Sequence, residues 1–287
     1  MMSDYRGILR GTFVDEVNAA FPAVAWQPSN LLRVLCFTLP TAAAAMLVNA
    51  RLAAVLSSSS SSSSSSLLSP TAADTAAAAA AAGLDVAESA AAAPALLHVS
   101  QEAVLAVLMP AAVWLALGPR VVSARWDSYW VLQTLATCAV LFPLVDPLLW
   151  GAWQPAVQAV LGPAPVNPLV ATLQQAADAG DWRSVGLHCA ASGVLGPLWE
   201  EVFWRGFFLT ALTKVLPLPA CIAFSSLNFA VLHLSPHNLL PLLVLSSVCD
   251  SLYFRSGGNL LAPLLLHGLW NMSQVLQIAL LHKQTFV

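Results

Sequence analysis

Long apolar stretches, separated by proline and glycine breaks, constrain this chain more than any other feature. A helix that crosses a bilayer needs about 20 mostly apolar residues, because its backbone polar groups must be paired within the segment. Such stretches recur here, and only 9% of the residues are charged, against about 25% in a typical soluble domain. With 58% hydrophobic residues, the chain has too few charges to cover a water-facing surface. We therefore predict an all-α, polytopic transmembrane helical bundle.

The apolar stretches predict about seven spans. The expected helices are Leu31–Leu56, Val99–Leu117, Trp130–Trp150, Val185–Val215, Pro219–Leu234, Leu239–Phe254 and Leu260–Leu281. Pro143 and Pro147 interrupt the third of them, and residues 151–182 are expected to form a loop with room for an interfacial helix. Tryptophans gather at the edges of the stretches, as in the interfacial belts of membrane proteins.

A segment of low sequence complexity divides the chain further. Ten consecutive serines, Ser57–Ser66, precede an alanine-rich run, and polyserine cannot bury apolar surface, so we expect a disordered linker there. The predicted division is an N-terminal segment at 1–30, a first transmembrane helix at 31–56, the Ser/Ala-rich linker at 57–97, helices and a loop at 98–182, and a helical core at 183–287. The first segment lacks the pattern of a secretory signal. A net charge of −3 argues against nucleic acid as a partner.

Polar groups interrupt three successive apolar helices in the last third of the chain. Ionisable groups within a membrane are costly and usually face a partner or a cavity. Glu201 and Arg205 are four residues apart, so they share a helix face and can pair. Glu200 is rotated by about 100° from Glu201 and points elsewhere. The same four-residue spacing joins Phe229 to His233 and His267 to Asn271.

One carboxylate, two imidazoles and one amide suit a definite reaction. A carboxylate in a low-dielectric pocket is a stronger base than one in water, and it can take a proton from a water molecule. One imidazole can hold that water, while a second imidazole and an amide can donate to a developing oxyanion. This chemistry needs no Ser or Cys nucleophile. The five cysteines lie in apolar stretches without CxxC spacing, so we expect small buried side chains rather than metal ligands or disulfides.

Together the motifs resemble the CAAX-protease and bacteriocin-processing family (CPBP, or Abi), which is marked by EExxxR, FxxxH and HxxxN. Here these are Glu200-Glu201…Arg205, Phe229…His233 and His267…Asn271, in that order, within about residues 183–281. The resemblance implies an intramembrane glutamic endopeptidase. It implies that Glu200 is the general base, that His233 helps to activate the water, and that His267 and Asn271 form the oxyanion site. Glu201, Arg205 and Phe229 would be supporting residues.

The resemblance also implies a setting. The stretch after Arg205 looks similar to plastid members from plants and algae, which favours a chloroplast membrane, with the endoplasmic reticulum as the alternative. The partners would be the lipid bilayer and a peptide or membrane-protein substrate, and no cofactor or metal is expected. Prenylated substrates belong mainly to the endoplasmic-reticulum branch of the family.

Two rival functions remain open at this stage. The first is a membrane scaffold or assembly factor that keeps the protease fold without catalysis. The second is a metalloprotease, since Glu and two His can bind zinc, although the chain lacks the HExxH pattern of common helical zinc proteases. Outside the motifs, Asp250 is expected to pair with Arg255 or to line a cavity. His98, His188, His237 and His282 have no partner at helical spacing and are interpreted as surface or packing residues.

Overall fold

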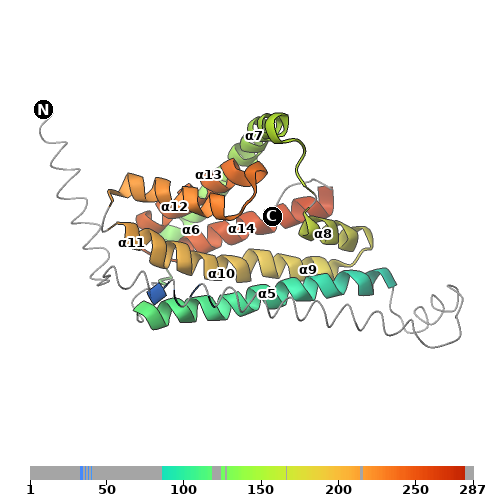
Figure 1. The fold of residues 1–287 in the computed structure, drawn as a ribbon, viewed down its shortest axis with the longest axis horizontal. Helices are drawn as coiled ribbons and strands as arrows, with labels where there is room; N and C mark the ends of the chain where they lie inside the picture. Colours follow the sequence, from blue (N-terminus) through green and yellow to red (C-terminus); the bar gives the residue numbers. More distant parts are fainter. Residues whose placement is uncertain are drawn as a thin grey trace, which may run out of the picture. The chain divides into compact units, whose positions relative to one another are not determined.

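A computed structural model describes residues 33, 34, 36, 38, 40, 86–117, 124–126, 128–165, 167–213 and 216–281. Within these residues, helices are the only regular secondary structure (Figure 1), which confirms the all-α prediction. The expected first span at 31–56 lies outside the described residues, apart from the five isolated helical positions from 33 to 40. Most of the expected linker also lies outside them.

Helix α5 (Val86–Leu117) ends where the sequence predicts but begins earlier. Its first twelve residues fall in the segment that we expected to be disordered, so the linker prediction is too long at its C-terminal end. Alanine dominates that part of the helix, and alanine has the highest helix propensity of all residues. The alanine run therefore extends the helix instead of interrupting it.

Helices α6 (Ser128–Val140), η3 (Leu141–Val145) and α7 (Asp146–Leu161) follow one another without a non-helical residue. The prediction that this helix would end at Trp150 is wrong, and the first part of the expected loop is helical. Proline lacks an N–H and clashes with the carbonyl four residues earlier. The wider π-turn of η3, which contains Pro143 and directly precedes α7, accommodates this break within a continuing helix.

The remaining helices lie close to their predicted positions. Helix α8 (Pro168–Asp178) occupies the segment where an interfacial helix was expected, and the Asn167 side chain caps it by accepting from the Leu169 N–H at 2.9 Å. Helices α12 (Leu218–Leu232), α13 (Leu239–Arg255) and α14 (Leu261–Leu281) match their predicted ranges to within two residues.

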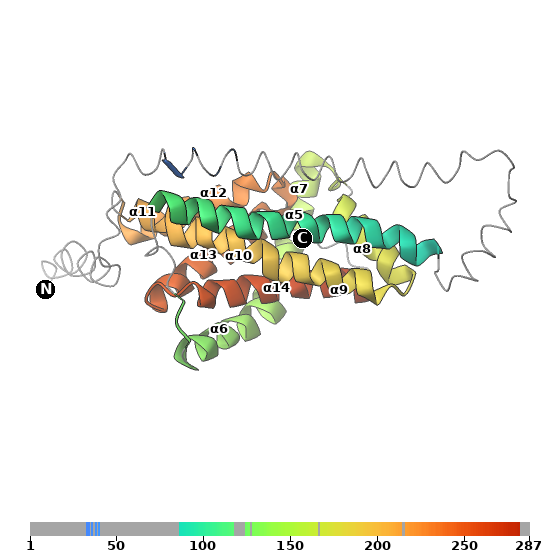
Figure 2. The same cartoon turned by 90° about the horizontal axis from the view of Figure 1, so that it is seen from below.

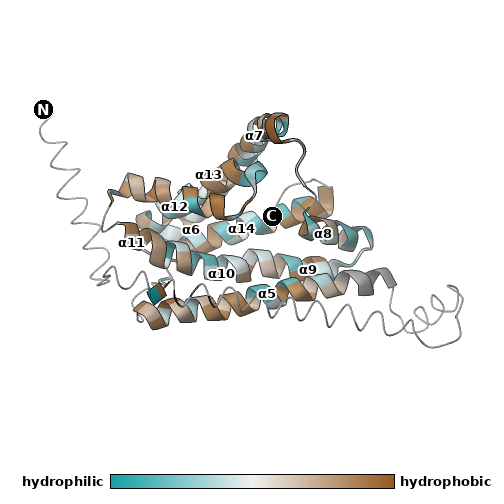
Figure 3. Ribbon diagram, viewed as in Figure 1, coloured by the Kyte–Doolittle hydropathy of each residue, from teal (hydrophilic) through white to brown (hydrophobic). Residues whose placement is uncertain are grey.

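Among the residues that the structure describes, three helical segments are long and apolar enough to cross a membrane: Ala92–Leu117, Ser128–Leu161 and Leu261–Leu281. Hydrophobic residues colour most of α5 and α12 in Figure 3. Many large apolar side chains on these helices face outward; Val107 is 68% exposed and Leu132 is 66% exposed. A surface of this kind requires lipid rather than water, which identifies an integral membrane protein.

The fold has two compact units, which we describe separately. In the first, which includes Met109–Ala164 and Leu198–His267, α12 and α13 lie side by side (Figure 1), and Figure 2 shows the same helices from below. The short 3₁₀ turn η6 (Pro236–Asn238) joins them. The core of this unit includes Phe207, Leu209, Cys221, Tyr253 and Leu260, all nearly inaccessible to solvent.

The second unit includes the described parts of Leu39–Leu108, together with Pro165–Pro197 and Gly268–Val287 up to residue 281. Helix α8 packs on α9 (Trp182–Ala190), and the core contains Leu173, Val185, Val275 and Ile278. Gly268 lies against the backbone carbonyl of Gly193, so close that a Cβ on Gly268 would overlap that oxygen. Glycine at this point allows two helices to approach each other closely.

Helical hydrogen bonding runs from Trp182 to Leu212 in five consecutive segments. After α9 these are η4 (Ala191–Leu195), α10 (Gly196–Glu201), η5 (Val202–Leu209) and α11 (Thr210–Leu212). The segments η4 and η5 are π-helical and flank the short helix that carries Glu200 and Glu201. π-segments within α-helices are often found at functional sites.

Candidate active site

The predicted ion pair between Glu201 and Arg205 is present in the first unit. Nη1 of Arg205 donates to Oε1 of Glu201 at 2.8 Å, and the side chains are 0% and 1% exposed. Such a pair, deprived of water, requires further hydrogen bonds to offset its desolvation. The structure supplies them from two other helices, α13 and α14.

Arg205 uses the rest of its guanidinium group on α13. Its Nε donates to Oδ1 of Asp250 at 2.8 Å, and its Nη2 donates to Oγ of Ser246 at 2.7 Å and to the Ser246 carbonyl at 3.0 Å. The ring of Phe229, on α12, lies 5.2 Å from the guanidinium carbon, within the range of a cation–π contact. The arginine thereby fixes α12 and α13 to the helix that carries the two glutamates.

Asp250 is a member of this cluster that the sequence reasoning placed incorrectly. We expected it to pair with Arg255 or to line a cavity, whereas it is fully buried and paired with Arg205. Oδ2 of Asp250 accepts from Oγ of Ser226 at 3.1 Å. Asp250 and Arg205 are 45 residues apart, so no helical spacing indicates the contact.

His267 joins the two glutamates. Its Nδ1 lies 2.7 Å from Oε1 of Glu201, and its Nε2 lies 4.0 Å from Oε2 of Glu200. A carboxylate only accepts, so Nδ1 carries a proton and donates it to Glu201. The other ring nitrogen, Nε2, consequently faces Glu200, whose side chain is 17% exposed while that of His267 is 4% exposed.

Phe229 contacts both of the predicted site histidines. Its ring centroid is 4.6 Å from that of His233, as the four-residue spacing predicted, and 5.8 Å from that of His267. His233 directly follows the last residue of α12, and its Nδ1 donates to the Phe229 carbonyl at 2.7 Å. Because Nδ1 is occupied as a donor, Nε2 of His233 is the nitrogen left to interact with a water or a substrate.

Asn271 lies in the second unit, one helical turn after His267 on α14. Its Nδ2 donates to the Ser192 carbonyl at 2.8 Å. That carbonyl lacks its usual helical donors, because the Gly196 N–H bonds to Ala191 in the π-turn and the next residue, Pro197, has no N–H. Asn271 therefore satisfies a carbonyl that the π-turn exposes, and its second amide hydrogen is not used by this bond.

A pair of histidines in the second unit was not foreseen. Nδ1 of His98, on α5, and Nδ1 of His188, on α9, are 3.0 Å apart, and His188 is 1% exposed. We had interpreted both as residues without a partner, since 90 positions separate them. In the first unit, His237 has a structural contact, because its Nε2 is 3.0 Å from the Gly162 carbonyl.

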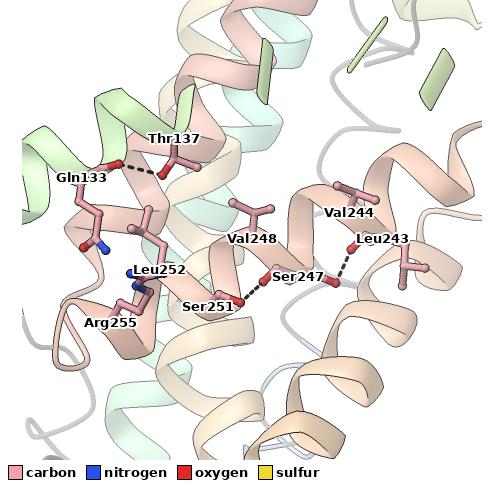
Figure 4. A pocket seen from close by; sticks show the side chains of 9 residues that line it. All are labelled: Gln133, Thr137, Leu243, Val244, Ser247, Val248, Ser251, Leu252 and Arg255. Atoms are coloured by element: carbon pink, nitrogen blue, oxygen red, sulfur yellow. Dashed lines mark hydrogen bonds between the residues drawn. The ribbon is translucent and has the colours of Figure 1, made fainter. Parts of the chain in front are cut away.

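A pocket of about 380 Å³ lies between α6 and α13 in the first unit (Figure 4). It is lined by Gln133, Thr137, Leu243, Val244, Ser247, Val248, Ser251, Leu252 and Arg255, and none of these belongs to the three motifs. The hydroxyls of Ser247 and Ser251 donate to carbonyls of their own helix, at 2.8 and 2.7 Å. The pocket is therefore separate from the cluster around Arg205.

Within the described parts of the chain, no group of three or more His, Cys, Asp or Glu residues is placed to hold a metal ion. The arrangement around Glu200 instead combines a partly exposed carboxylate, an oriented imidazole and a buried ionic anchor. The expectation of a metal-independent site stays a prediction.

Comparison with known families finds a match in the C-terminal part of the chain. Residues 182–273 match the model of a family described as Rce1-like, type II CAAX prenyl endopeptidase Rce1-like. No curated protein and no solved structure matches the chain significantly. The matched segment contains all three motifs and covers roughly a third of the chain. Over residues 182–273, this chain is thus similar to the Rce1-like type II CAAX prenyl endopeptidases, as the motif resemblance predicted.

Proposed function

We propose that this protein is an intramembrane endopeptidase that hydrolyses peptide bonds of membrane-associated proteins with a water activated by Glu200. The single observation that carries the proposal is the orientation of His267 between the two glutamates, with Nδ1 on Glu201 and Nε2 facing Glu200. Catalytic groups need this kind of support, because a base is effective only when it is held within reach of its proton.

In the proposed reaction, the carboxylate of Glu200 removes a proton from water, and the water oxygen bonds to the carbonyl carbon of the scissile peptide. The carbonyl oxygen becomes an oxyanion. Glu200 then gives the proton to the leaving nitrogen as the C–N bond breaks, so one water is consumed and no other reactant is needed. We assign to Nε2 of His233 the task of holding the water, since its Nδ1 is fixed on Phe229.

His267 and Asn271 are the proposed donors to the oxyanion. His267 can donate from Nε2 only when both of its nitrogens are protonated, because Nδ1 is already bonded to Glu201. Asn271 contributes the amide hydrogen that is not used by Ser192. Glu201, Arg205 and Phe229 position these groups without touching the reacting atoms.

The matched family and the apolar helices support a protein substrate and a membrane environment, and the resemblance of the stretch after Arg205 to plastid members supports the proposed location. We propose a membrane-associated protein substrate, and we propose a chloroplast membrane as the location, with the endoplasmic reticulum as the alternative. Whether the substrate carries a prenyl group is a separate question, which paired peptides with and without a farnesyl-cysteine can answer.

The test uses the full chain purified in detergent or nanodiscs and a peptide library that includes such pairs. We expect cleavage that survives a metal chelator and is lost in Glu200→Gln, while Ser247→Ala, which lies in the separate pocket on α13, cleaves like wild type. Chelator-sensitive cleavage would replace the proposal with a metalloprotease. A folded protein that cleaves nothing, and whose Glu200→Gln variant restores the phenotype of a null strain, would indicate a scaffold.

A further inference from the structure

The pocket between α6 and α13 in the first unit has no part in the proposed reaction, since none of its residues belongs to the three motifs. It has a volume of about 380 Å³ and two kinds of lining (Figure 4). Apolar side chains and hydroxyls line most of it, whereas Arg255 stands at the C-terminal end of α13. An apolar slot with a cation at one end suits a ligand that has a hydrocarbon part and an anionic group.

Arg255 is exposed and lies in the last turn of α13, where arginines often bind the last carbonyls of a helix. Here those carbonyls are already paired. The carbonyls of residues 252–254 accept from backbone N–H groups of the turn that follows. Nη2 of Arg125 donates to the carbonyls of Ser256 and Gly257, at 3.4 and 3.1 Å. The end of the helix therefore does not need the guanidinium of Arg255.

Arg255 also has no acidic partner among the residues that the structure describes. Asp250, which the sequence suggested as its partner, is buried and bonded to Arg205. A guanidinium is always charged and presents its N–H groups in a fork that matches the oxygens of a phosphate. The cation of Arg255 is thus available to an anionic ligand, and its geometry favours phosphate.

The end of the pocket that holds Arg255 has the composition of a membrane–water interface. The bond from Arg125 to the Gly257 carbonyl attaches the start of α6 to the end of α13. At the start of α6, Trp126 is 80% exposed and Tyr129 is 71% exposed. Exposed Trp and Tyr side chains are typical of the headgroup level of a bilayer. We therefore place Arg255 at the depth of lipid phosphates.

The length of the pocket fits one leaflet of a bilayer. Its lining on α13 extends from Leu243 to Arg255, which is about 18 Å at a rise of 1.5 Å per residue. One leaflet contributes about 15 Å of hydrocarbon. An acyl chain that begins at a headgroup near Arg255 and follows the slot consequently lies beside Val248, Val244 and Leu243.

Gln133 offers a second polar contact in the pocket. Its Oε1 is buried and accepts no hydrogen bond within the described part of the chain. Figure 4 shows Gln133 at the same end of the pocket as Arg255. A buried acceptor without a donor costs stability. A hydroxyl in a lipid headgroup would supply the donor, whereas the trimethylammonium group of phosphatidylcholine has no N–H or O–H to donate.

We propose that this pocket binds one molecule of an anionic glycerophospholipid with a hydroxylated headgroup, for which phosphatidylglycerol is the probe. The phosphate contacts the guanidinium of Arg255, a headgroup hydroxyl donates to Oε1 of Gln133, and one acyl chain fills the slot along α13. This lipid site is distinct from the cluster around Glu200, and its occupancy does not depend on peptidase activity.

Native mass spectrometry of the full chain in detergent tests the site, because a neutral micelle contributes no anionic surface of its own. The delipidated protein is titrated with dioleoyl phosphatidylglycerol, with dioleoyl phosphatidylcholine and with glycerol phosphate. The two lipids have the same chains and differ in the headgroup, while glycerol phosphate has the anion without the chains. We expect one phosphatidylglycerol per protein, bound at least about tenfold more tightly than phosphatidylcholine, and no binding of glycerol phosphate.

Substitutions separate the parts of the site. Arg255→Gln should weaken phosphatidylglycerol binding about tenfold, and Arg255→Lys should retain most of it. Val248→Phe keeps the charge but fills the slot, and it should also weaken binding at least about tenfold. Gln133→Leu removes one neutral hydrogen bond and should weaken binding about threefold. Arg183→Gln, at an exposed arginine of the second unit, is the matched control and should bind like wild type.

Equal affinity for the two lipids would overturn the proposal, and so would an Arg183→Gln protein that loses as much affinity as Arg255→Gln. Glycerol phosphate bound as tightly as phosphatidylglycerol would also overturn it, because the apolar slot would then contribute nothing. Unchanged affinity in Val248→Phe or Gln133→Leu would contradict the assigned position of the lipid. Unfolding midpoints without added lipid identify any variant that fails to fold, and the comparison of lipids on the wild-type protein then still decides the proposal.

Discussion

The two faces of α13 carry almost the same residues in two different situations. Ser246 and Asp250 face the interior, where they hold Arg205 of another helix. Ser247 and Ser251, which follow them by one position, line the pocket between α6 and α13 (Figure 4). Their hydroxyls donate to carbonyls of α13 itself. A polar residue in an apolar helix therefore indicates a site only when another helix supplies its partner.

The largest expected difference in stability is between substitutions of two arginines, one bonded to the interior face of α13 and one that lines the pocket. Arg205→Leu leaves Glu201 and Asp250 as buried carboxylates without a cation, which should destabilise the protein by about 3–5 kcal/mol. Arg255→Leu, at the rim of the pocket, should change stability by no more than about 0.5 kcal/mol. Thermal unfolding in detergent measures both. Equal losses in the two variants would remove the distinction between the faces.

Two glycines, one in each unit, test how much close packing around a helix contributes to stability. Gly268→Ala places a methyl group against the Gly193 carbonyl and should cost about 1–3 kcal/mol. In the first unit, Gly151 of α7 has no atom within 4 Å of the position of a Cβ, so Gly151→Ala should be neutral or stabilising by up to about 1 kcal/mol. The apparent unfolding midpoint should fall in Gly268→Ala and should stay the same or rise in Gly151→Ala. A Gly268→Ala protein as stable as wild type would show that the helices can separate at no cost.

Ser246 and Ser247 are the most closely matched pair, because they are the same residue type at adjacent positions of α13. Ser246→Ala removes the hydroxyl that accepts from Nη2 of Arg205 and should cost about 1–2 kcal/mol, although the Ser246 carbonyl still accepts. Ser247→Ala removes only a bond within α13 and should stay within about 0.5 kcal/mol of wild type. The difference between the two unfolding midpoints is the measurement. A larger loss for Ser247→Ala would reverse the assignment of the faces.

The smallest effect is expected from the serine run, which lies outside the described residues. Deleting Ser57–Ser66 should leave the cleavage rate within about twofold of wild type, because polyserine buries no apolar surface. The rate of cleavage of one library peptide, compared between the two proteins at equal concentration, measures this. Loss of activity on deletion would assign the segment a function that its composition does not indicate.

Local spacing predicted the parts of the site that lie on one helix. The pair of Glu201 and Arg205 and the contact of Phe229 with His233 follow from helical periodicity, which a sequence displays directly. The ranges of α12, α13 and α14 were likewise predicted, because proline and glycine mark their ends.

Contacts between distant helices could not be predicted. Asp250 reaches Arg205 across 45 positions, and His98 reaches His188 across 90, so no local pattern contains either pair. In the segment 128–161 the prolines led to a wrong prediction of where the helix ends, because a π-turn accommodates Pro143 and the helix continues. The hydrogen bond from Asn271 to the Ser192 carbonyl could not be predicted either, because that carbonyl lacks a helical donor only as a result of the π-turn η4.

The proposed role of Glu200 is tested most directly by the kcat/KM of Glu200→Gln on a peptide that the wild-type protein cleaves. Glutamine keeps the size of the side chain but cannot take a proton from water. We expect kcat/KM to fall by about 10²–10⁴-fold while the unfolding midpoint stays near that of wild type. A folded Glu200→Gln protein that cleaves within about threefold of the wild-type rate would contradict the assignment of Glu200 as the base.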